Sequence, residues 1–121
     1  AHVAARYDER LGQLDAIQLP PRDDSTRQHS WHLYSIRLNL DRLRIDRAQF
    51  IEALKDREIF CSMHWKPLHL MPYYVGTYGY GEGLFPVAER EWLRQVSLPI
   101  FPAMTDAEVE AVCVDIEEIV S

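Results

Sequence analysis

The chain has 121 residues, of which 47% are hydrophobic and 26% are charged, and its formal net charge is -6. This composition is ordinary for a globular protein, and the length predicts one domain over residues 1–121. The negative balance and the scattering of the basic residues disfavour nucleic acid as a partner. No apolar run approaches the roughly 18 residues of a membrane span and no signal peptide is visible, so we expect no membrane insertion and a cytoplasmic protein.

The first residues predict an amphipathic helix, because their apolar side chains recur at helical spacing. These side chains are Val3, Tyr7, Leu11 and Leu14. Neither an initiator Met nor an N-cap precedes this helix, which we interpret as the mark of a piece of a longer polypeptide. The polar, proline-rich run 19–28 predicts a connection, and the alternation over 31–40 predicts a half-buried strand with Arg37 pointing away from its apolar face.

Two capping boxes mark helix starts, one formed by Asp46 and Gln49 and the other by Thr105 and Glu108. The first helix is predicted to end at about Arg57. The second is predicted to run to the C-terminus, because an apolar stripe continues along it. Its members are Val109, Val112, Cys113, Ile116 and Val120.

A second strand is predicted over 58–64, with Cys61 on its inner face and His64 emerging on the other. The Tyr- and Gly-rich run 70–85 fits a short helix followed by a mobile loop. Pro86 predicts the first turn of a further helix, and 97–100 reads as a short extended piece. The residues of that helix expected to face inward are Val87, Ala88, Trp92 and Leu93.

Helices and strands therefore alternate along the chain. This order predicts an α/β (α+β) two-layer sandwich, in which a small, mostly antiparallel sheet is covered by helices. The two cysteines, Cys61 and Cys113, fit reduced thiols of a core better than a disulfide framework.

Five segments in order resemble the C-terminal part of the DegT/StrS family of pyridoxal-phosphate-dependent sugar aminotransferases, which are fold type I enzymes. They cover nearly the whole chain, and the most specific are the His-containing run and the last one. The segments are Ala5–Leu11, Ser30–Tyr34, Asp46–Lys55, Met63–His69 with Tyr73 and Tyr74, and Ser97–Glu108. One departure is Glu58, where the family often places Gly at a helix end, so the turn there is expected to differ.

The resemblance implies transfer of an amino group, with glutamate as the expected donor, to a keto sugar attached to a nucleotide. It also implies a homodimer, and a large N-terminal domain that holds the coenzyme and is missing from this chain. Residues 1–121 are then the small C-terminal domain, inactive alone and with no pyridoxal phosphate expected on the fragment. The resemblance carries substrate contact onto His64 and Trp65 and, less directly, onto His69.

The residues themselves allow the same role. A neutral imidazole exchanges hydrogen bonds with sugar hydroxyls, and an indole offers an apolar face to a pyranose ring. Tyr74 is included in the substrate site for its hydroxyl. The alternatives are that His64 or His69 caps the nearby loop, and that Tyr73 or Tyr74 provides packing area only.

A coenzyme lysine is not expected here, because Lys55 lies on a predicted surface helix and Lys66 has no phosphate-binding loop nearby. A zinc site built from Cys61, His64 and His69 lacks a fourth ligand, and the alternation of the strand separates Cys61 from His64. Metal binding therefore stays a minor alternative, beside a separate sugar- or protein-binding module that kept this fold.

Isolation from a large domain predicts exposed apolar surface. We expect it around Trp31, Trp65 or the first helix, with self-association as the consequence.

Overall fold

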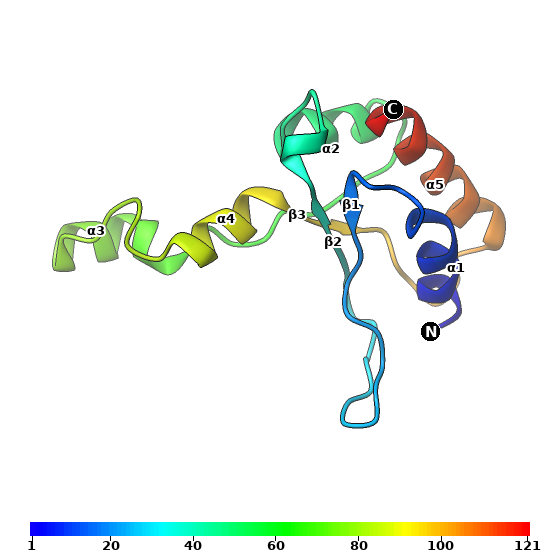
Figure 1. Cartoon of the computed structure of the whole chain (residues 1–121), viewed down its shortest axis with the longest axis horizontal. Coiled ribbons are helices and arrows are strands. Elements are labelled where there is room, and N and C mark those ends of the chain that lie inside the picture. The colour runs from blue at the N-terminus through cyan, green and yellow to red at the C-terminus, as the bar shows by residue number, and fades with distance from the viewer.

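The computed structural model describes all residues, 1–121, and is built from five α-helices, three strands and two 3-10 turns (Figure 1). The helices are α1 (His2–Leu11), α2 (Arg47–Lys55), α3 (Pro72–Tyr78), α4 (Pro86–Arg94) and α5 (Asp106–Val120). The strands are β1 (Ile17–Gln18), β2 (Tyr34–Leu38) and β3 (Gln95–Leu98), and the 3-10 turns are η1 (Leu40–Arg42) and η2 (Leu68–Leu70). None of the helices has the length and apolar character that crossing a bilayer requires.

The strands form one antiparallel sheet in the order β1-β2-β3, which confirms the predicted fold class. In β2 the side chains of Tyr34, Ile36 and Leu38 are fully buried, while Ser35 and Arg37 fall on the other face. The strand is shorter than the predicted 31–40. The two-residue strand β1 lies just before the predicted connection and was not predicted, because it is too short for a periodic pattern.

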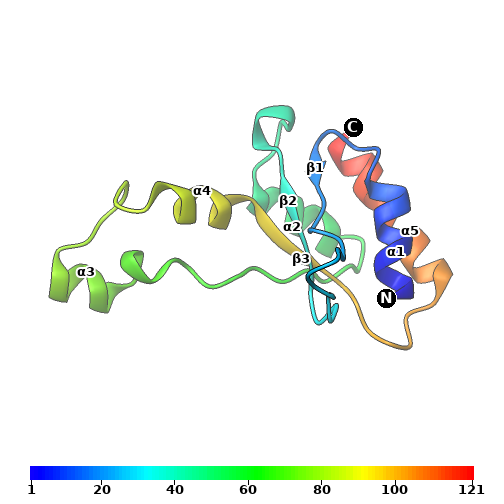
Figure 2. The same ribbon diagram turned by 60° about the horizontal axis from the view of Figure 1, so that its bottom comes forward.

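Helices α1 and α5 lie side by side against the buried face of the sheet (Figures 1 and 2). The side chains of Tyr7 and Tyr34 are fully buried there, and both hydroxyls are satisfied. Tyr7 donates to the Pro99 carbonyl at 2.8 Å, and Tyr34 donates to Asp8 at 2.6 Å. The thiol of Cys113 is buried in this core and Cys61 is half-buried, both free. We call the sheet with α1, α2 and α5 the body.

Both predicted capping boxes are present. The Asp46 carboxylate accepts from the Gln49 amide, whose side chain accepts in return from the Asp46 amide. Thr105 and Glu108 make the same reciprocal pair at the start of α5. Because a capping box is built from residues three positions apart, the sequence alone places these helix starts.

The turn after α2 is wound as a left-handed cap even though it lacks glycine. Glu58 has φ 63°, its amide donates to Lys55, and the Ile59 amide donates to the Leu54 carbonyl at 2.9 Å. These two bonds make a Schellman motif, and the buried Ile59 and Leu54 side chains supply its apolar contact. The expectation of a different turn at Glu58 is therefore wrong, because these bonds and this burial hold the strained backbone in place.

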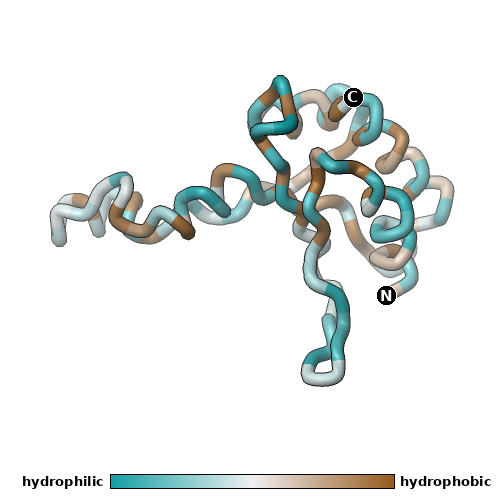
Figure 3. Tube along the Cα trace, in the orientation of Figure 1, coloured by the Kyte–Doolittle hydropathy of each residue, from teal (hydrophilic) through white to brown (hydrophobic).

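Residues 62–94, which we call the arm, project from the body (Figures 1 and 2). The predicted strand 58–64 is not formed. Only Ser62 pairs with Ser97 in an isolated bridge, and the chain then leaves the sheet. His69 is the one buried residue of the arm. Apolar segments nevertheless recur along it (Figure 3).

Most of the exposed large hydrophobic side chains belong to the arm. Those in the arm are Met63, Trp65, Leu68, Tyr73, Val75, Tyr78, Leu84, Phe85, Val87 and Leu93. Of the three places at which exposed apolar surface was expected, the structure has it at Trp65. Trp31 packs on the core, and α1 buries its apolar face against α5. The inward face predicted for α4 is also wrong, since Val87 and Leu93 are exposed and only Trp92 is half-buried.

A second projection, the loop 20–31, contains most of the polar connection predicted over 19–28. Asp24 closes its tip by accepting from the hydroxyl and the amide of Thr26 and from the Arg27 amide. These bonds, first that from the Thr26 hydroxyl, lower the pKa of Asp24. The loop is tied to the body by an ion pair of 3.1 Å between Arg22 and Asp8.

Candidate functional site

His64 lies at the root of the arm, where the chain leaves the sheet. Its Nε2 is 3.0 Å from the Ser35 hydroxyl and 2.8 Å from the Ser97 hydroxyl, and the two hydroxyls are 2.7 Å apart. Ser35 and Ser97 are opposite one another in the β2–β3 register, so strand pairing brings the hydroxyls together. The imidazole is held at Nε2, and Nδ1 has no partner within the chain and is available to a ligand.

Helix α4 fixes the backbone of the same residue. The Trp92 indole N–H donates to the His64 carbonyl at 3.2 Å, and the Arg47 guanidinium lies 4.8 Å from the centre of the Trp92 ring. Arg47 also donates to the Trp92 carbonyl, and burial lowers the pKa of this guanidinium. The root of the arm is therefore clamped between α2, α4 and the sheet.

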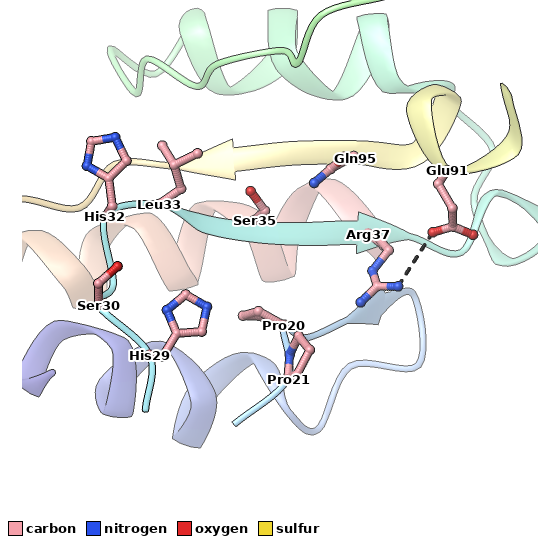
Figure 4. A pocket seen from close by; sticks show the side chains of 10 residues that line it. All are labelled: Pro20, Pro21, His29, Ser30, His32, Leu33, Ser35, Arg37, Glu91 and Gln95. Carbon is pink, nitrogen blue, oxygen red and sulfur yellow. Dashed lines mark ion pairs between the residues drawn. The ribbon is translucent and has the colours of Figure 1, made fainter. Parts of the chain in front are cut away.

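An open groove of about 450 Å³ lies on the solvent-facing side of β2 (Figure 4). It is lined by Pro20, Pro21, His29, Ser30, His32, Leu33, Ser35, Arg37, Glu91 and Gln95. The loop 20–31, strand β2 and helix α4 thus contribute its walls. Ser35 connects the groove to His64, because its hydroxyl contacts that imidazole.

Arg37 pairs with Glu91 of α4 at one end of the groove, with 3.5 Å between Nη1 and Oε2 (Figure 4). The prediction that it points away from the apolar strand face is confirmed. Only 30% of its side chain is exposed, so the charge is not freely solvated.

The other residues predicted to contact substrate are spread along the arm. Trp65 follows His64 and is 88% exposed, so its indole has almost no contact within the chain. Tyr74 is half-buried in a row of aromatic rings, 5.4 Å from the Tyr73 ring and 6.1 Å from that of Tyr78. None of His64, Trp65 or Tyr74 lines the groove beside β2.

His69 is buried inside the arm. Its Nε2 is 2.7 Å from Oε1 of Glu89, and its ring meets the Phe85 ring edge-on at 4.9 Å. Glu89 also accepts from the amides of Gly83 and Phe85. The bond from Gly83, followed by the contact with His69, lowers the pKa of Glu89. The Gly-rich loop is therefore anchored by Glu89 in this structure, and its predicted mobility stays a prediction.

The structure brings no three His, Cys, Asp or Glu side chains into a group that could hold a metal ion. The set Cys61, His64 and His69 is dispersed: Cys61 packs on the body, His64 binds the sheet hydroxyls and His69 lies within the arm.

The two lysines do not fit a coenzyme imine. Lys55 pairs on the surface of α2 with Glu52 at 3.1 Å, and Lys66 is exposed on the arm. A lysine that forms an imine with a coenzyme must be partly neutral and held in place, and exposure provides neither condition.

Sequence reasoning missed Ser35, Ser97 and Glu89. Ser97 carries a signal in retrospect, since it is a hydroxyl flanked by apolar residues within a buried strand. Ser35 and Glu89 carry none, because a polar residue on the outer face of a strand or on a surface helix is ordinary. Their roles follow from partners that are distant in the chain.

The same arrangement of sheet, helices and arm occurs as part of longer chains among solved structures. Among solved structures, S. venezuelae DesV, in complex with a ketimine intermediate, matches 98% of this chain with a TM-score of 0.84 and 30% identity. The chain covers 30% of that protein.

The sequence model of the family described as "DegT/DnrJ/EryC1/StrS aminotransferase family" matches residues 1–117. The chain therefore belongs to the DegT/DnrJ/EryC1/StrS aminotransferase family. It is 44% identical over 98% of its length to uncharacterized protein MJ1066 of Methanocaldococcus jannaschii. It is 36% identical over 98% of its length to spore coat polysaccharide biosynthesis protein SpsC of Bacillus subtilis. It spans 31% and 30% of these two proteins, about a third of each.

Proposed function

We propose that residues 1–121 are the C-terminal small domain of an aminotransferase that moves an amino group from glutamate to a nucleotide-linked keto sugar. The observation that carries this proposal is the family match over residues 1–117. The names of SpsC, a polysaccharide biosynthesis protein, and of the sugar aminotransferases that share the fold support a sugar as the acceptor.

Pyridoxal phosphate supplies the chemistry of amino transfer in this proposal, and the rest of the polypeptide holds it. The exposure of Lys55 and Lys66 supports this division, since neither lysine fits an imine. The fragment alone is then inactive, and its task is to close one side of the active site.

The proposed sugar-contacting residues are His64, Trp65, His69 and Tyr74. His64 is the best supported of them, because two hydroxyls orient its ring and leave Nδ1 without a partner. Trp65 follows with an exposed indole that offers a flat apolar surface. His69 has the weakest support, because Glu89 already occupies its Nε2.

We also propose that the arm is covered in the complete protein, by its large domain and by a second subunit. The support is the row of exposed apolar side chains along residues 63–93, which a single chain leaves in water.

The experiment uses the intact polypeptide that contains residues 1–121. Glutamate and nucleotide-linked keto sugars are supplied, and 2-oxoglutarate and amino sugar are measured. We expect turnover, and His64→Ala is expected to lower kcat/KM for the sugar about 10- to 100-fold, the scale of one lost hydrogen bond to a ligand.

The matched control is His2→Ala, because His2 is an exposed histidine on α1 that pairs with Asp106. If both variants behave alike, His64 does not contact the substrate. If no keto sugar is aminated but the protein binds a sugar nucleotide without turnover, the chain belongs instead to a binding module that kept the fold.

A further inference from the structure

We propose that the groove beside β2 binds an anionic group, a carboxylate or a phosphate, with the Arg37 guanidinium as its principal ligand. This inference rests on the proposed function and extends it, since the amino donor there carries carboxylates and the nucleotide carries phosphates. The shared chemistry is a cluster of anionic oxygens, and the experiment below separates the two sources.

Arg37 has unused donors. A guanidinium has five N–H groups, and no hydrogen bond engages those of Arg37. Its single ion pair, with Glu91, is 3.5 Å long, which exceeds the 2.7–2.9 Å typical of a charge-assisted hydrogen bond. Arg94, in contrast, donates to Gln18 at 2.6 Å and to Asn39 at 3.2 Å. Of the two, only Arg37 lines the groove.

The Glu91 carboxylate beside Arg37 is shared among several cationic side chains. Glu91 is the one carboxylate that lines the groove, and three guanidinium groups share it. Its oxygens are 3.5 Å from Arg37, 3.3 Å from Arg90 and 3.8 Å from Arg94. The Oε2 atom of Glu91 is buried and accepts no hydrogen bond, so its contact with Arg37 is an ion pair without a hydrogen bond. Because Glu91 is shared with Arg90 and Arg94, it neutralises Arg37 only in part.

His29 is held in position on the opposite wall. Its Nδ1 accepts from the Trp31 amide at 3.0 Å, so its proton lies on Nε2, a free donor. The Trp31 indole stacks on the same ring at 4.0 Å. The Asp23 carboxylate accepts from the His29 amide at 2.7 Å and fixes the loop.

The backbone between the two lining histidines is strained. Trp31 has φ 53°, a left-handed conformation that is unusual for a bulky side chain. Strained residues of this kind cluster at binding sites, where the surrounding structure holds them for a purpose. Here the strain places His29 and His32 on the wall of one groove.

The size and lining of the groove fit part of a small polar ligand. Its volume of about 450 Å³ lies within the range of small-molecule sites, roughly 300–1,000 Å³. Besides Arg37 and the histidines, the neutral hydrogen-bonding groups of Ser30, Ser35 and Gln95 line it. Since Ser35 also contacts His64, the anion site adjoins the proposed sugar site.

The test measures binding to the intact polypeptide by calorimetry, with inorganic phosphate, glutarate and uridine diphosphate as probes. For the probes that bind, Arg37→Gln is expected to weaken the affinity about 10- to 100-fold, the scale of a hydrogen bond to a charged group. Arg37→Lys keeps the charge without the fork of donors, and we expect intermediate affinity. The matched control is Arg90→Gln, because Arg90 shares Glu91 but does not line the groove.

Glu91→Gln is expected to change the affinity for anions in the opposite direction to Arg37→Gln. It removes the competing carboxylate, so anions are expected to bind about 3- to 10-fold more tightly. A variant that merely disturbed the fold would weaken binding, so tighter binding identifies the groove as the site.

If Arg37→Gln loses affinity for glutarate only, the groove binds a carboxylate. If it loses affinity for phosphate and uridine diphosphate only, the groove binds a phosphate. If Arg37→Gln and Arg90→Gln bind all probes like the unchanged protein, or if none binds, the inference is overturned. Because binding needs no turnover, a protein that fails to transaminate leaves this result intact, and active variants with unchanged binding refute the inference alone.

Discussion

The body and the arm of this protein contain similar fractions of apolar residues but use them in opposite ways. The body collects nineteen buried hydrophobic residues into one core between the sheet, α1, α2 and α5. The arm buries His69 alone and leaves Trp65, Leu68 and Val87 exposed. A single helical turn or a short helix cannot cover its own apolar side, and it needs a layer packed against it.

Polar contacts and a row of aromatic rings hold the arm together. Glu89 gathers His69 and the amides of Gly83 and Phe85, while His64 and Trp92 fasten the root to the body. Such contacts specify a shape with little stabilisation, since each replaces a hydrogen bond to water. The body therefore has an apolar core of its own, whereas the arm keeps its shape with little apolar burial.

The largest expected effect concerns the core of the body. Phe50→Ala removes a fully buried ring and is expected to lower the free energy of unfolding by about 3–5 kcal/mol. Trp65→Ala removes a larger ring that is 88% exposed, and we expect a loss below about 0.5 kcal/mol. Urea denaturation of residues 1–121, followed by circular dichroism, measures both. Equal losses would show that body and arm share one core.

The junction of the two regions is expected to respond less. Ser97→Ala removes a buried hydroxyl that bonds Ser35 and His64, and the expected loss is about 1–2 kcal/mol. Ser62→Ala is the control, because the exposed Ser62 pairs with Ser97 through backbone atoms only. The same denaturation experiment applies. A loss for Ser62→Ala as large as that for Ser97→Ala would deny the hydroxyl cluster its role.

A gain is expected at the end of α2. Glu58→Gly relieves a left-handed backbone at φ 63° and is expected to stabilise the body by about 0.5–1 kcal/mol. Glu58→Ala keeps the Cβ atom and therefore the strain, so it separates the backbone effect from the loss of charge. Thermal denaturation compares the two, and an equal gain from alanine would contradict the argument.

The smallest effect on global stability is predicted for the pH response of the arm. Folding lowers the pKa of Glu89 below its ordinary value of 4.5. Above pH 4.5 the ionised carboxylate therefore stabilises the loop. This contribution is lost as the pH falls through the lowered pKa. Hydrogen exchange of the Gly83 and Phe85 amides, corrected for intrinsic rates, should accelerate below that pH while the core amides of the body stay protected.

The control for this response is Glu89→Gln. It cannot ionise, so exchange of the same two amides should be fast at every pH. If acid opened the core amides of the body together with the loop, the two regions would form one cooperative unit.

Local patterns predicted much of the body. The alternation of Tyr34, Ile36 and Leu38 identified the central strand, and the pair Thr105 and Glu108 identified the start of α5. These features depend on residues a few positions apart, so their physics is complete within a short segment. The prediction of a strand over 58–64 was wrong because an alternating pattern shows only that a segment has an apolar and a polar face. Whether a neighbouring strand occupies the edge is decided elsewhere in the chain.

The candidate site divides in the same way. The sequence by itself determined that Arg37 points away from the core. Only the tertiary structure decided that His64 meets the hydroxyls of Ser35 and Ser97, and that Arg37 pairs with Glu91 at one end of a groove. The physical reason is that these contacts join residues far apart in the chain, and the antiparallel register of β2 and β3 sets the distances between them.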